Sequence, residues 1–386
     1  MPNREQSNMP DNELPNFEQN PFVVIWEMTR SCALKCVHCR AEAVEQRNPD
    51  ELNEKEAFTL LYEVRHFGKP LVVLTGGDPM RRPDVFNVVE YGTGLGLRMA
   101  VTPSATSEMT CEKVRKLKEA GLARLAVSLD GSTPEIHDAF RRVEGSYQWT
   151  LDIIRWANEA ELPVQINTTI TRHNIKDIDA LCSLMESLKI VLWSVFFLVP
   201  VGRGKLEDEI RGSEYEFVFN KMVDLSLRCS FDIKSTAAPH YRRVVIQRKR
   251  KSGEFDEGIS GGGFFAEGVG SRGGDGVGRS AGVNDGNGFL FISHTGEIYP
   301  SGFLPISTGN VRTDSLVDVY RNSFLFKRLR DTSRLKGKCG ACEYKTVCGG
   351  SRARAWGVFR DYMQSDPFCV YVPKGYKITE NEKRFW

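Results

Sequence analysis

The feature that most constrains the fold is a repeat of short β-branched runs, polar turns and stretches with helical periodicity, which extends from Phe22 to about Pro200. Such alternation is the pattern of parallel β/α units, in which each helix returns the chain to the same end of the sheet. The six candidate strands are Phe22–Met28, Leu71–Thr75, Arg98–Thr102, Arg124–Leu129, Val164–Thr169 and Val191–Val199. They predict an α/β fold with a partial (β/α)6 TIM-type barrel.

Helical periodicity fills the gaps between these strands, and several of the helical stretches end in Gly or just before Pro, as helices tend to. The predicted helices include Asn53–Phe67, Cys111–Ala120, Tyr147–Ala160 and Lys176–Leu188. In barrels of this type the chemistry lies on the loops that follow the carboxyl ends of the strands. We therefore expect the functional residues of this half on those loops.

The rest of the chain differs in composition from the barrel segment. Residues 1–20 are rich in Asn, Glu and Pro and lack an apolar secretory signal, so they predict a disordered tail and a cytoplasmic protein. Residues 246–288 include a Gly-dense stretch that predicts a linker or mobile loop between a core at 21–245 and a small α+β domain at 289–386. In that small domain, Gly288–Ser293 and Glu297–Tyr299 predict two strands, and a short helix is expected near Leu316–Tyr320.

Charge and hydrophobicity exclude some classes of partner. No apolar run approaches the roughly 20 residues that span a bilayer, and the 52 basic and 50 acidic residues nearly cancel to a net charge of +2. We expect a soluble protein that binds neither a membrane nor a nucleic acid.

Ten cysteines could form a disulfide framework, but that architecture is typical of short secreted chains. Seven of the ten instead fall into two clusters with ligand-like spacing: Cys32, Cys36 and Cys39, and Cys339, Cys342, Cys348 and Cys369. The isolated Cys111, Cys182 and Cys229 are interpreted as small buried hydrophobic residues.

The first cluster is a CxxxCxxC triplet directly after the first predicted strand. Three thiolates leave one iron of a [4Fe-4S] cubane open, as a catalytic metal requires. The alternative is a zinc site, which usually takes four protein ligands, and His38 between the last two cysteines is poorly placed to be the fourth.

At this point the sequence resembles the radical S-adenosylmethionine (SAM) superfamily, whose defining triplet has this spacing and often an aromatic residue or His before the last cysteine, here His38. The resemblance implies that SAM chelates the open iron. It also implies that an electron from the cluster cleaves SAM to a 5′-deoxyadenosyl radical.

Further segments resemble the SAM-binding motifs of the same superfamily. Gly76, Gly77, Asp78 and Pro79 look like its GGEP segment with Asp in place of Glu, which implies contacts to the SAM ammonium group, although such a segment can also be an ordinary turn. The remaining SAM contacts implied by the resemblance are Thr102, Ser128, Asp130, Asn167, Val199 and either Arg141 or Arg142 as the carboxylate clamp. For Asn167 and Val199, packing in the core is the alternative.

The second cluster, CxxCxxxxxC followed by Cys369, could on spacing alone close a zinc site or a [4Fe-4S] cluster. It resembles the C-terminal SPASM/twitch domains of radical SAM enzymes, whose full version holds two auxiliary clusters. Here Ser301 and Arg352 stand where two of the family's cysteines are expected. The resemblance therefore implies one auxiliary [4Fe-4S] cluster with all irons ligated by the protein, serving electron transfer or structure.

Three segments narrow the resemblance to the tetrapyrrole-modifying SPASM enzymes of heme pathways: Gly202–Gly204, Ala238–Arg243 and Cys348–Ala355. This implies a substrate with carboxylate side chains, which Arg203, Arg242, Arg243, Arg352 and Arg354 could hold unless they are solvated surface residues. His240 and Tyr241 are the candidates for acid or base chemistry on the presumed substrate side.

Two other functions are compatible with parts of this pattern. Many SPASM enzymes modify peptides, and a non-catalytic iron-sulfur redox sensor would also need cysteine clusters. A sensor has no need for the GGDP segment, the VSLDG segment and an open iron together. We expect an enzyme that takes electrons from a donor such as flavodoxin or ferredoxin.

Overall fold

The computed structural model describes residues 16–252 and 282–386. The centre of the predicted Gly-rich linker and most of the predicted N-terminal tail lie outside the described residues. The strands are β1 (Val23–Thr29), β2 (Leu71–Gly76), β3 (Arg98–Val101), β4 (Arg124–Ser128), β5 (Val164–Ile170), β6 (Leu192–Phe197), β7 (Asp232–Thr236), β8 (Phe289–Ile292) and β9 (Ile298–Tyr299).

These strands form one sheet in the order β7-β6-β5-β4-β3-β2-β1-β8-β9. The first seven are parallel neighbours in sequence order, which confirms the predicted parallel α/β fold. The sheet is larger than the six strands predicted, because the short polar segment of β7 gave no hydrophobic signal. β8 extends the sheet on the other side by pairing in parallel with β1, Val23 opposite Phe289.

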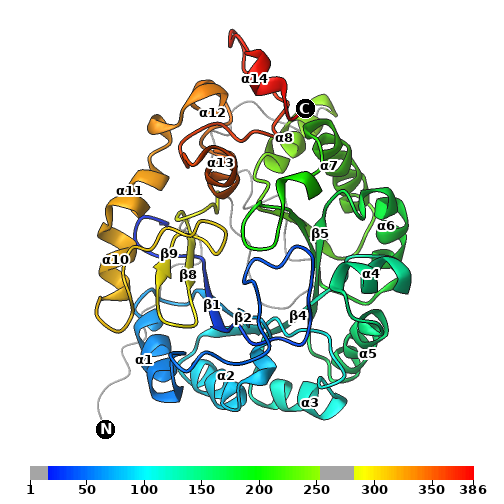
Figure 1. Cartoon of the computed structure of the whole chain (residues 1–386), viewed down its shortest axis with the longest axis vertical. Helices are drawn as coiled ribbons and strands as arrows, with labels where there is room; N and C mark the ends of the chain where they lie inside the picture. The colour runs from blue at the N-terminus through cyan, green and yellow to red at the C-terminus, as the bar shows by residue number, and fades with distance from the viewer. Residues whose placement is uncertain (1–15, 253–281) are drawn as a thin grey trace.

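The longer helices lie on the outside of the curved sheet, as Figure 1 shows for α1 to α6. Their capping follows the sequence: α1 begins after Asn53, whose side chain forms a capping box with Glu56. The helices are α1 (Glu54–Arg65), α2 (Val85–Gly94), α3 (Cys111–Glu119), α4 (Pro134–Arg141), α5 (Ser146–Glu159), α6 (Ile178–Ser187), α7 (Gly212–Ser226), α8 (Tyr241–Lys251), α10 (Leu316–Asn322), α11 (Phe324–Arg330), α12 (Gly337–Ala341), α13 (Arg352–Phe359) and α14 (Glu380–Lys383).

The two faces of the sheet differ in character. Side chains toward the helices form the main hydrophobic core, which includes the fully buried Trp26 and Trp193. On β5, Ile166 and Ile170 belong to this core, whereas the alternate residues Gln165 and Asn167 face inward and remain partly exposed. At these positions the inner face of the sheet is therefore polar and partly exposed, unlike the packed interior of a complete barrel.

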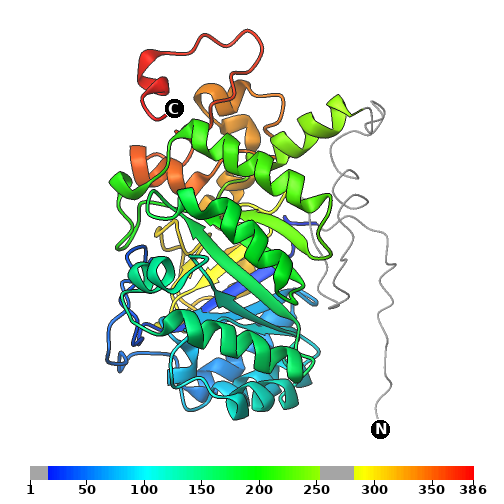
Figure 2. The ribbon, with the colours of Figure 1, turned by 90° about the vertical axis from the view of Figure 1, so that its right-hand side faces the viewer.

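The C-terminal helices α12, α13 and α14 gather at one end of the molecule beside α7 and α8, in both views (Figures 1 and 2). The predicted domain boundaries stay a prediction: α8 continues past residue 245 to Lys251, and β8 hydrogen-bonds to β1 across the predicted division. In the described part of the chain, no helix combines the length and the apolar character needed to cross a membrane.

Candidate functional site

The first three cysteines lie on the loop that follows β1, at the carboxyl end of the strand. Their side chains group with Leu34, Ala43 and Val143 in one cluster. The loop closes on itself where the N–H of Cys32 donates to the carbonyl of Val44 at 2.8 Å. The predicted triplet is thus brought together at the mouth of the barrel.

Each sulfur of this triplet meets a hydrogen-bond donor. The N–H groups of Leu34 and Ala43 donate to Sγ of Cys32 and Cys39 at 3.3 and 3.5 Å, and Nη1 of Arg141 donates to Sγ of Cys36 at 3.5 Å. Burial raises the pKa of the Cys32 thiol to about 11, so only a bound cation would hold it as a thiolate. Donors aimed at a buried sulfur fit a metal-bound thiolate, because such bonds tune iron-sulfur clusters.

The spacing of the cysteines bears on the choice between zinc and an iron-sulfur cluster. Ligands of one tetrahedral zinc ion have sulfurs about 3.8 Å apart. Within residues 16–252 and 282–386, no group of three or more His, Cys, Asp or Glu side chains is arranged to hold a single metal ion. The first cluster also offers only three cysteines, one fewer than the four protein ligands that a structural zinc site usually takes.

The GGDP segment packs directly on the cysteine loop. A Cβ at Gly76 would lie 2.2 Å from the carbonyl oxygen of Thr29, and one at Gly77 would lie 2.4 Å from that of Ser31. The N–H groups of Gly77 and Asp78 donate to these same two carbonyls at 2.7 Å each. Only glycine allows this approach, so the segment fixes the position of the cysteine loop.

Asp78 and Pro79 begin a short 3-10 helix at the same place. Oδ1 of the buried Asp78 accepts the N–H groups of Met80 and Ser104 at 3.1 and 3.2 Å. Burial raises the pKa of this carboxyl to about 6. Oδ2 accepts no hydrogen bond from the described residues, so it is the atom of Asp78 that suits a ligand donor.

The residues after β4 form a buried ion pair that reaches the cysteine loop. Asp130 is fully buried, accepts the N–H of Thr169 at 2.7 Å and pairs with Arg141. Burial lowers the pKa of the Arg141 guanidinium, but Asp130 and Cys36 together raise it overall. Arg142 is exposed in the left-handed conformation that ends α4, so Arg141 is the arginine that the structure brings to the site.

The other predicted SAM contacts divide into two groups. Ser128 and Asn167 are paired in register on the inner face, and Thr102 is half-buried at the end of β3, so all three belong to the mouth. Val199 does not: its buried side chain packs with Leu304, Leu325 and Ala353. This packing favours the core-packing alternative for Val199.

His38 lies beside this site. Its ring is 4.6 Å from that of Phe140, and its Nδ1 is buried without a partner in the described part of the chain. Burial, and then the charges of Arg141 and Arg203, hold the pKa of His38 well below its ordinary value. The ring is therefore neutral.

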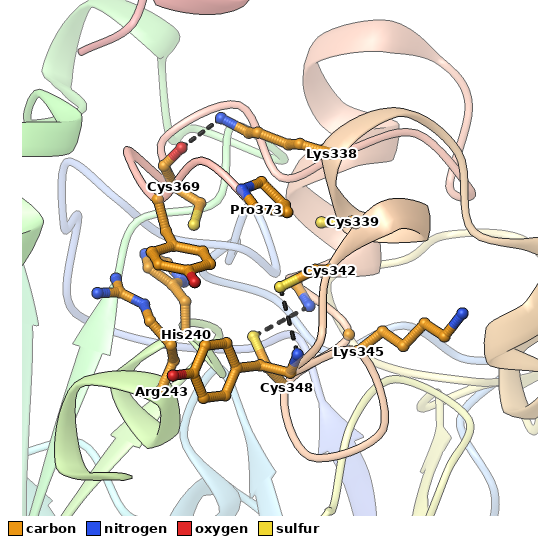
Figure 3. A pocket seen from close by; sticks show the side chains of 13 residues that line it. His240, Arg243, Lys338, Cys339, Cys342, Lys345, Cys348, Cys369 and Pro373 are labelled. Carbon is orange, nitrogen blue, oxygen red and sulfur yellow. Dashed lines mark hydrogen bonds between the residues drawn. The ribbon is translucent and has the colours of Figure 1, made fainter. Parts of the chain in front are cut away.

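The second cluster of cysteines surrounds one space. Cys339, Cys342, Cys348 and Cys369 line one pocket that is partly open to solvent, and Figure 3 shows their side chains around it. Backbone N–H groups of Tyr344, Gly350 and Asp366 donate to Sγ of Cys342, Cys348 and Cys339, each at 3.4 Å. Burial raises the pKa of Cys342 to about 11 and that of Cys369 to about 12. Four cysteine sulfurs around one space, three of them with backbone donors, fit a fully ligated cluster.

Ser301 and Arg352, the residues in place of expected cysteines, have structural partners. The N–H of Phe303 donates to Oγ of the buried Ser301 at 3.2 Å. Nη1 of Arg352 donates to the carbonyls of Tyr362 and Gln364 at 2.9 and 2.7 Å. Nη2 of Arg352 lies 3.8 Å from Sγ of Cys339.

Four of the five arginines predicted as substrate ligands are engaged inside the protein, which corrects that expectation. Arg243 pairs with Glu216, and Arg354 pairs with Asp366 and Glu209. Arg242 and Arg352 donate to backbone carbonyls, including those of Val283, Val347, Tyr362 and Gln364. Each of these four guanidinium groups already contacts internal acceptors, although Nε of Arg243 has no partner among the described residues, so only Arg203 keeps the predicted role.

His240 and Tyr241 are also corrected. His240 is buried between the rings of Tyr215 and Phe219, lines the second cysteine cavity, and burial lowers its pKa to about 3. Tyr241 is buried in the main core against Phe219, and burial raises its pKa. Neither side chain lies on the inner face of the sheet, so neither meets a substrate there.

Sequence reasoning missed a charged group at the end of β1. Glu27 faces inward, and its Oε1 and Oε2 contact His294 and Arg40 at 3.0 and 2.5 Å. Burial alone would raise its pKa, but Arg40 and His294 lower it to about 2. The signal was present as a lone carboxylate in the otherwise apolar run VVIWEMT.

Comparisons with known proteins agree with this geometry. A family profile described as the radical SAM superfamily matches residues 26–185. Over 353 residues the chain is 39% identical to AdoMet-dependent heme synthase of Methanosarcina barkeri, covering 92% of this chain and 97% of that protein. It is 28% identical to Fe-coproporphyrin III synthase of the same organism, covering 96% and 93%.

A solved structure of Streptococcus suis SuiB bound to precursor peptide SuiA superposes with a TM-score of 0.69 at 18% identity, covering 92% of this chain and 76% of that one. At this identity the likeness shows the fold alone.

Proposed function

The chain belongs to the radical SAM superfamily, whose members use a [4Fe-4S] cluster and SAM, and we propose that it acts on a carboxylate-bearing tetrapyrrole in heme synthesis. The observation that carries the family chemistry is the convergence of three elements at the barrel mouth. These are the cysteine loop, the GGDP segment packed against it and the Asp130–Arg141 pair that reaches Cys36. The tetrapyrrole substrate is supported by the relative named heme synthase, which matches over nearly the whole of both chains.

Cys32, Cys36 and Cys39 would hold the first cluster through three thiolates and leave one iron for SAM. When bound, this cluster and SAM supply a 5′-deoxyadenosyl radical that removes a hydrogen atom from substrate carbon. Oδ2 of Asp78 would accept a hydrogen bond from the SAM ammonium group, and Arg141 would face the SAM carboxylate while Asp130 holds its guanidinium in place. Ser128, Asn167 and Thr102 would line the nucleoside side.

Cys339, Cys342, Cys348 and Cys369 would hold one auxiliary [4Fe-4S] cluster in a domain formed by residues 289–386, attached to the core at 21–245. Removal of one hydrogen atom, one electron and CO2 from a propionate leaves a vinyl group. The auxiliary cluster would accept that electron.

The electrons for SAM cleavage would come from a flavodoxin or ferredoxin. All ten cysteines lie in the described part of the chain and none forms a disulfide, which supports a reducing compartment such as the cytoplasm.

The test is turnover of iron-coproporphyrin III by the anaerobically reconstituted protein with SAM and a reductant. Mass spectrometry is expected to show products that have lost the mass of propionate carboxylates, in amounts that follow 5′-deoxyadenosine. Cleavage of SAM without any change in the porphyrin would contradict the tetrapyrrole substrate. Modification of a short peptide in the same assay would favour a peptide-modifying enzyme instead.

A further inference from the structure

We infer that Arg203 binds a carboxylate of the substrate at the barrel mouth and thereby selects for anionic side chains. This inference rests on the proposed function and goes beyond it by naming the residue that recognises the substrate. It rests on where the backbone fixes Arg203, on the atoms of its guanidinium that have no partner, and on the balance of charge around it.

The loop after β6 fixes Arg203 against the first cysteine loop. Gly202 has a φ of +59°, and a Cβ there would lie 2.4 Å from the carbonyl oxygen of Arg40. The N–H of Arg203 donates to the carbonyl of Cys39 at 3.0 Å. The guanidinium therefore starts from a backbone position directly beside the third cysteine of the triplet.

The side chain of Arg203 has donors without acceptors. Its Nε and Nη2 are buried and meet no hydrogen-bond partner among the described residues, and no carboxylate there forms an ion pair with it. Burial of a charged donor without a partner is costly, and the cost is removed when an anion binds. A guanidinium is suited to grip a carboxylate in two parallel hydrogen bonds.

The carboxylates of Asp130 and Glu27 at the mouth are already paired with other arginines. Arg141 is neutralised by Asp130, and Glu27 is met by Arg40, with Arg30 at 3.6 Å. His38, whose pKa is lowered by burial and then by the charges of Arg141 and Arg203, adds a third buried nitrogen without a partner among the described residues. A carboxylate arriving at Arg203 would therefore not have to displace an existing ion pair.

Carboxylates would reach such a mouth from two sources, SAM and the substrate. SAM brings a single carboxylate, for which Arg141 stands between Asp130 and Cys36. A propionate-bearing porphyrin brings several. Arg203 is fixed next to Cys39 and Arg40, whereas Arg141 contacts Cys36, and we assign Arg203 to the substrate.

The test compares variants of the reconstituted holoprotein under anaerobic conditions. Arg203→Gln removes the charge, Arg203→Lys keeps it without the bidentate geometry, and Arg115→Gln removes an exposed arginine from α3 as a matched control. Binding of iron-coproporphyrin III and of its methyl ester is titrated by porphyrin absorbance. SAM binding is measured separately by equilibrium dialysis, and iron content verifies folding.

Arg203→Gln is expected to weaken binding of the free acid by about tenfold to a hundredfold, the effect of losing one charge-assisted contact. The affinity of Arg203→Lys for the free acid should lie between that of Arg203→Gln and that of wild type. The methyl ester should bind all four proteins equally, SAM affinity should not change, and Arg115→Gln should match wild type.

Three results would overturn the assignment. They are equal binding of the free acid by wild type and Arg203→Gln, an equal loss for the ester, and a loss of SAM affinity instead of porphyrin affinity. If wild type binds neither porphyrin, the proposed function itself fails. If wild type binds the free acid no better than the ester, the carboxylate contact is refuted even if Arg203→Gln does not fold.

Discussion

The guanidinium of Arg352 lies 3.8 Å from the sulfur of Cys339, at a position where a cysteine was expected. Where the family resemblance implies a cluster ligand, this chain has a buried cation, and its three other hydrogen bonds go to the backbone carbonyls of Gly350, Tyr362 and Gln364. The charge is therefore directed at the auxiliary site.

Loss of this charge should lower the reduction potential of the auxiliary cluster, because a nearby cation stabilises the reduced, more negative form. For Arg352→Gln we expect a fall on the order of 50 mV, equivalent to about 1.2 kcal/mol for one electron. Redox titration followed by electron paramagnetic resonance measures this. Arg352→Lys keeps the charge and should restore most of the potential; an unchanged or higher potential in Arg352→Gln would refute the electrostatic role.

The approach of Gly77 to the cysteine loop predicts a strong effect of one methyl group. In Gly77→Ala the new Cβ would lie 2.4 Å from the carbonyl oxygen of Ser31, so the loop must shift, at a cost of about 1–3 kcal/mol or more. Iron content after reconstitution and the Tm should both fall. Gly94→Ala is the matched control, since a Cβ there meets no atom within 4 Å, and wild-type iron content in Gly77→Ala would argue against the packing role.

The Asp130–Arg141 pair can be tested with a double-mutant cycle. Asp130→Asn leaves the guanidinium buried without its carboxylate, which typically costs about 3–5 kcal/mol. Adding Arg141→Met removes the unpaired charge, so the double variant should lose less stability than the sum of the single variants. Thermal unfolding measures the loss of stability in the two single variants and the double variant. If the loss in the double variant equals the sum of the single losses, the two residues are not coupled.

His137 predicts acid sensitivity of this region. Its Nδ1 accepts the N–H of Asp130 at 3.0 Å, and burial, followed by the charge of Arg141, lowers its pKa from 6.5 to about 3. A lowered histidine pKa means that the unfolded chain binds a proton first. The contribution of the neutral ring is therefore complete above pH 6.5 and is lost at up to about 1.4 kcal/mol per pH unit as the pH falls toward 3.

In His137→Asn, an amide oxygen can still accept the hydrogen bond, but the group no longer titrates. Stability measured between pH 7 and about pH 4.5 should fall less steeply in this variant than in wild type. His66→Asn, at an exposed histidine of the same chain, should keep the wild-type slope. An unchanged slope in His137→Asn would contradict the buried neutral ring.

Much of the fold could be predicted because hydrophobic periodicity is a local property. The sequences of β1 to β6 are apolar runs, and the structure confirms the strands predicted there. β7 could not be predicted, because its sequence DIKST is short and polar and is held by pairing with β6. The pairing of β8 with β1 is a tertiary contact between segments more than two hundred residues apart, which no local pattern encodes.

The site was predictable where backbone spacing determines chemistry, as in the two cysteine clusters and the GGDP turn. It was not predictable where a side chain has a choice of partner. Arg243, Arg352 and Arg354 have the sequence appearance of anion ligands, yet all three are buried against internal acceptors. The side chain of Val199 likewise packs in a hydrophobic cluster. Glu27 is a buried carboxylate that contacts Arg40 and His294, and His294 is far from it in sequence.

The most direct test of the central claim is formation of 5′-deoxyadenosine by anaerobically reconstituted protein supplied with SAM and dithionite. Wild type should carry about eight irons per chain if each site holds a four-iron cubane, and should release the nucleoside. Replacing Cys32, Cys36 and Cys39 with Ala should remove about half of the iron and abolish release. Replacing Cys342 and Cys348 with Ala should also remove about half while SAM cleavage persists. Fully loaded wild type that releases no 5′-deoxyadenosine would contradict the account.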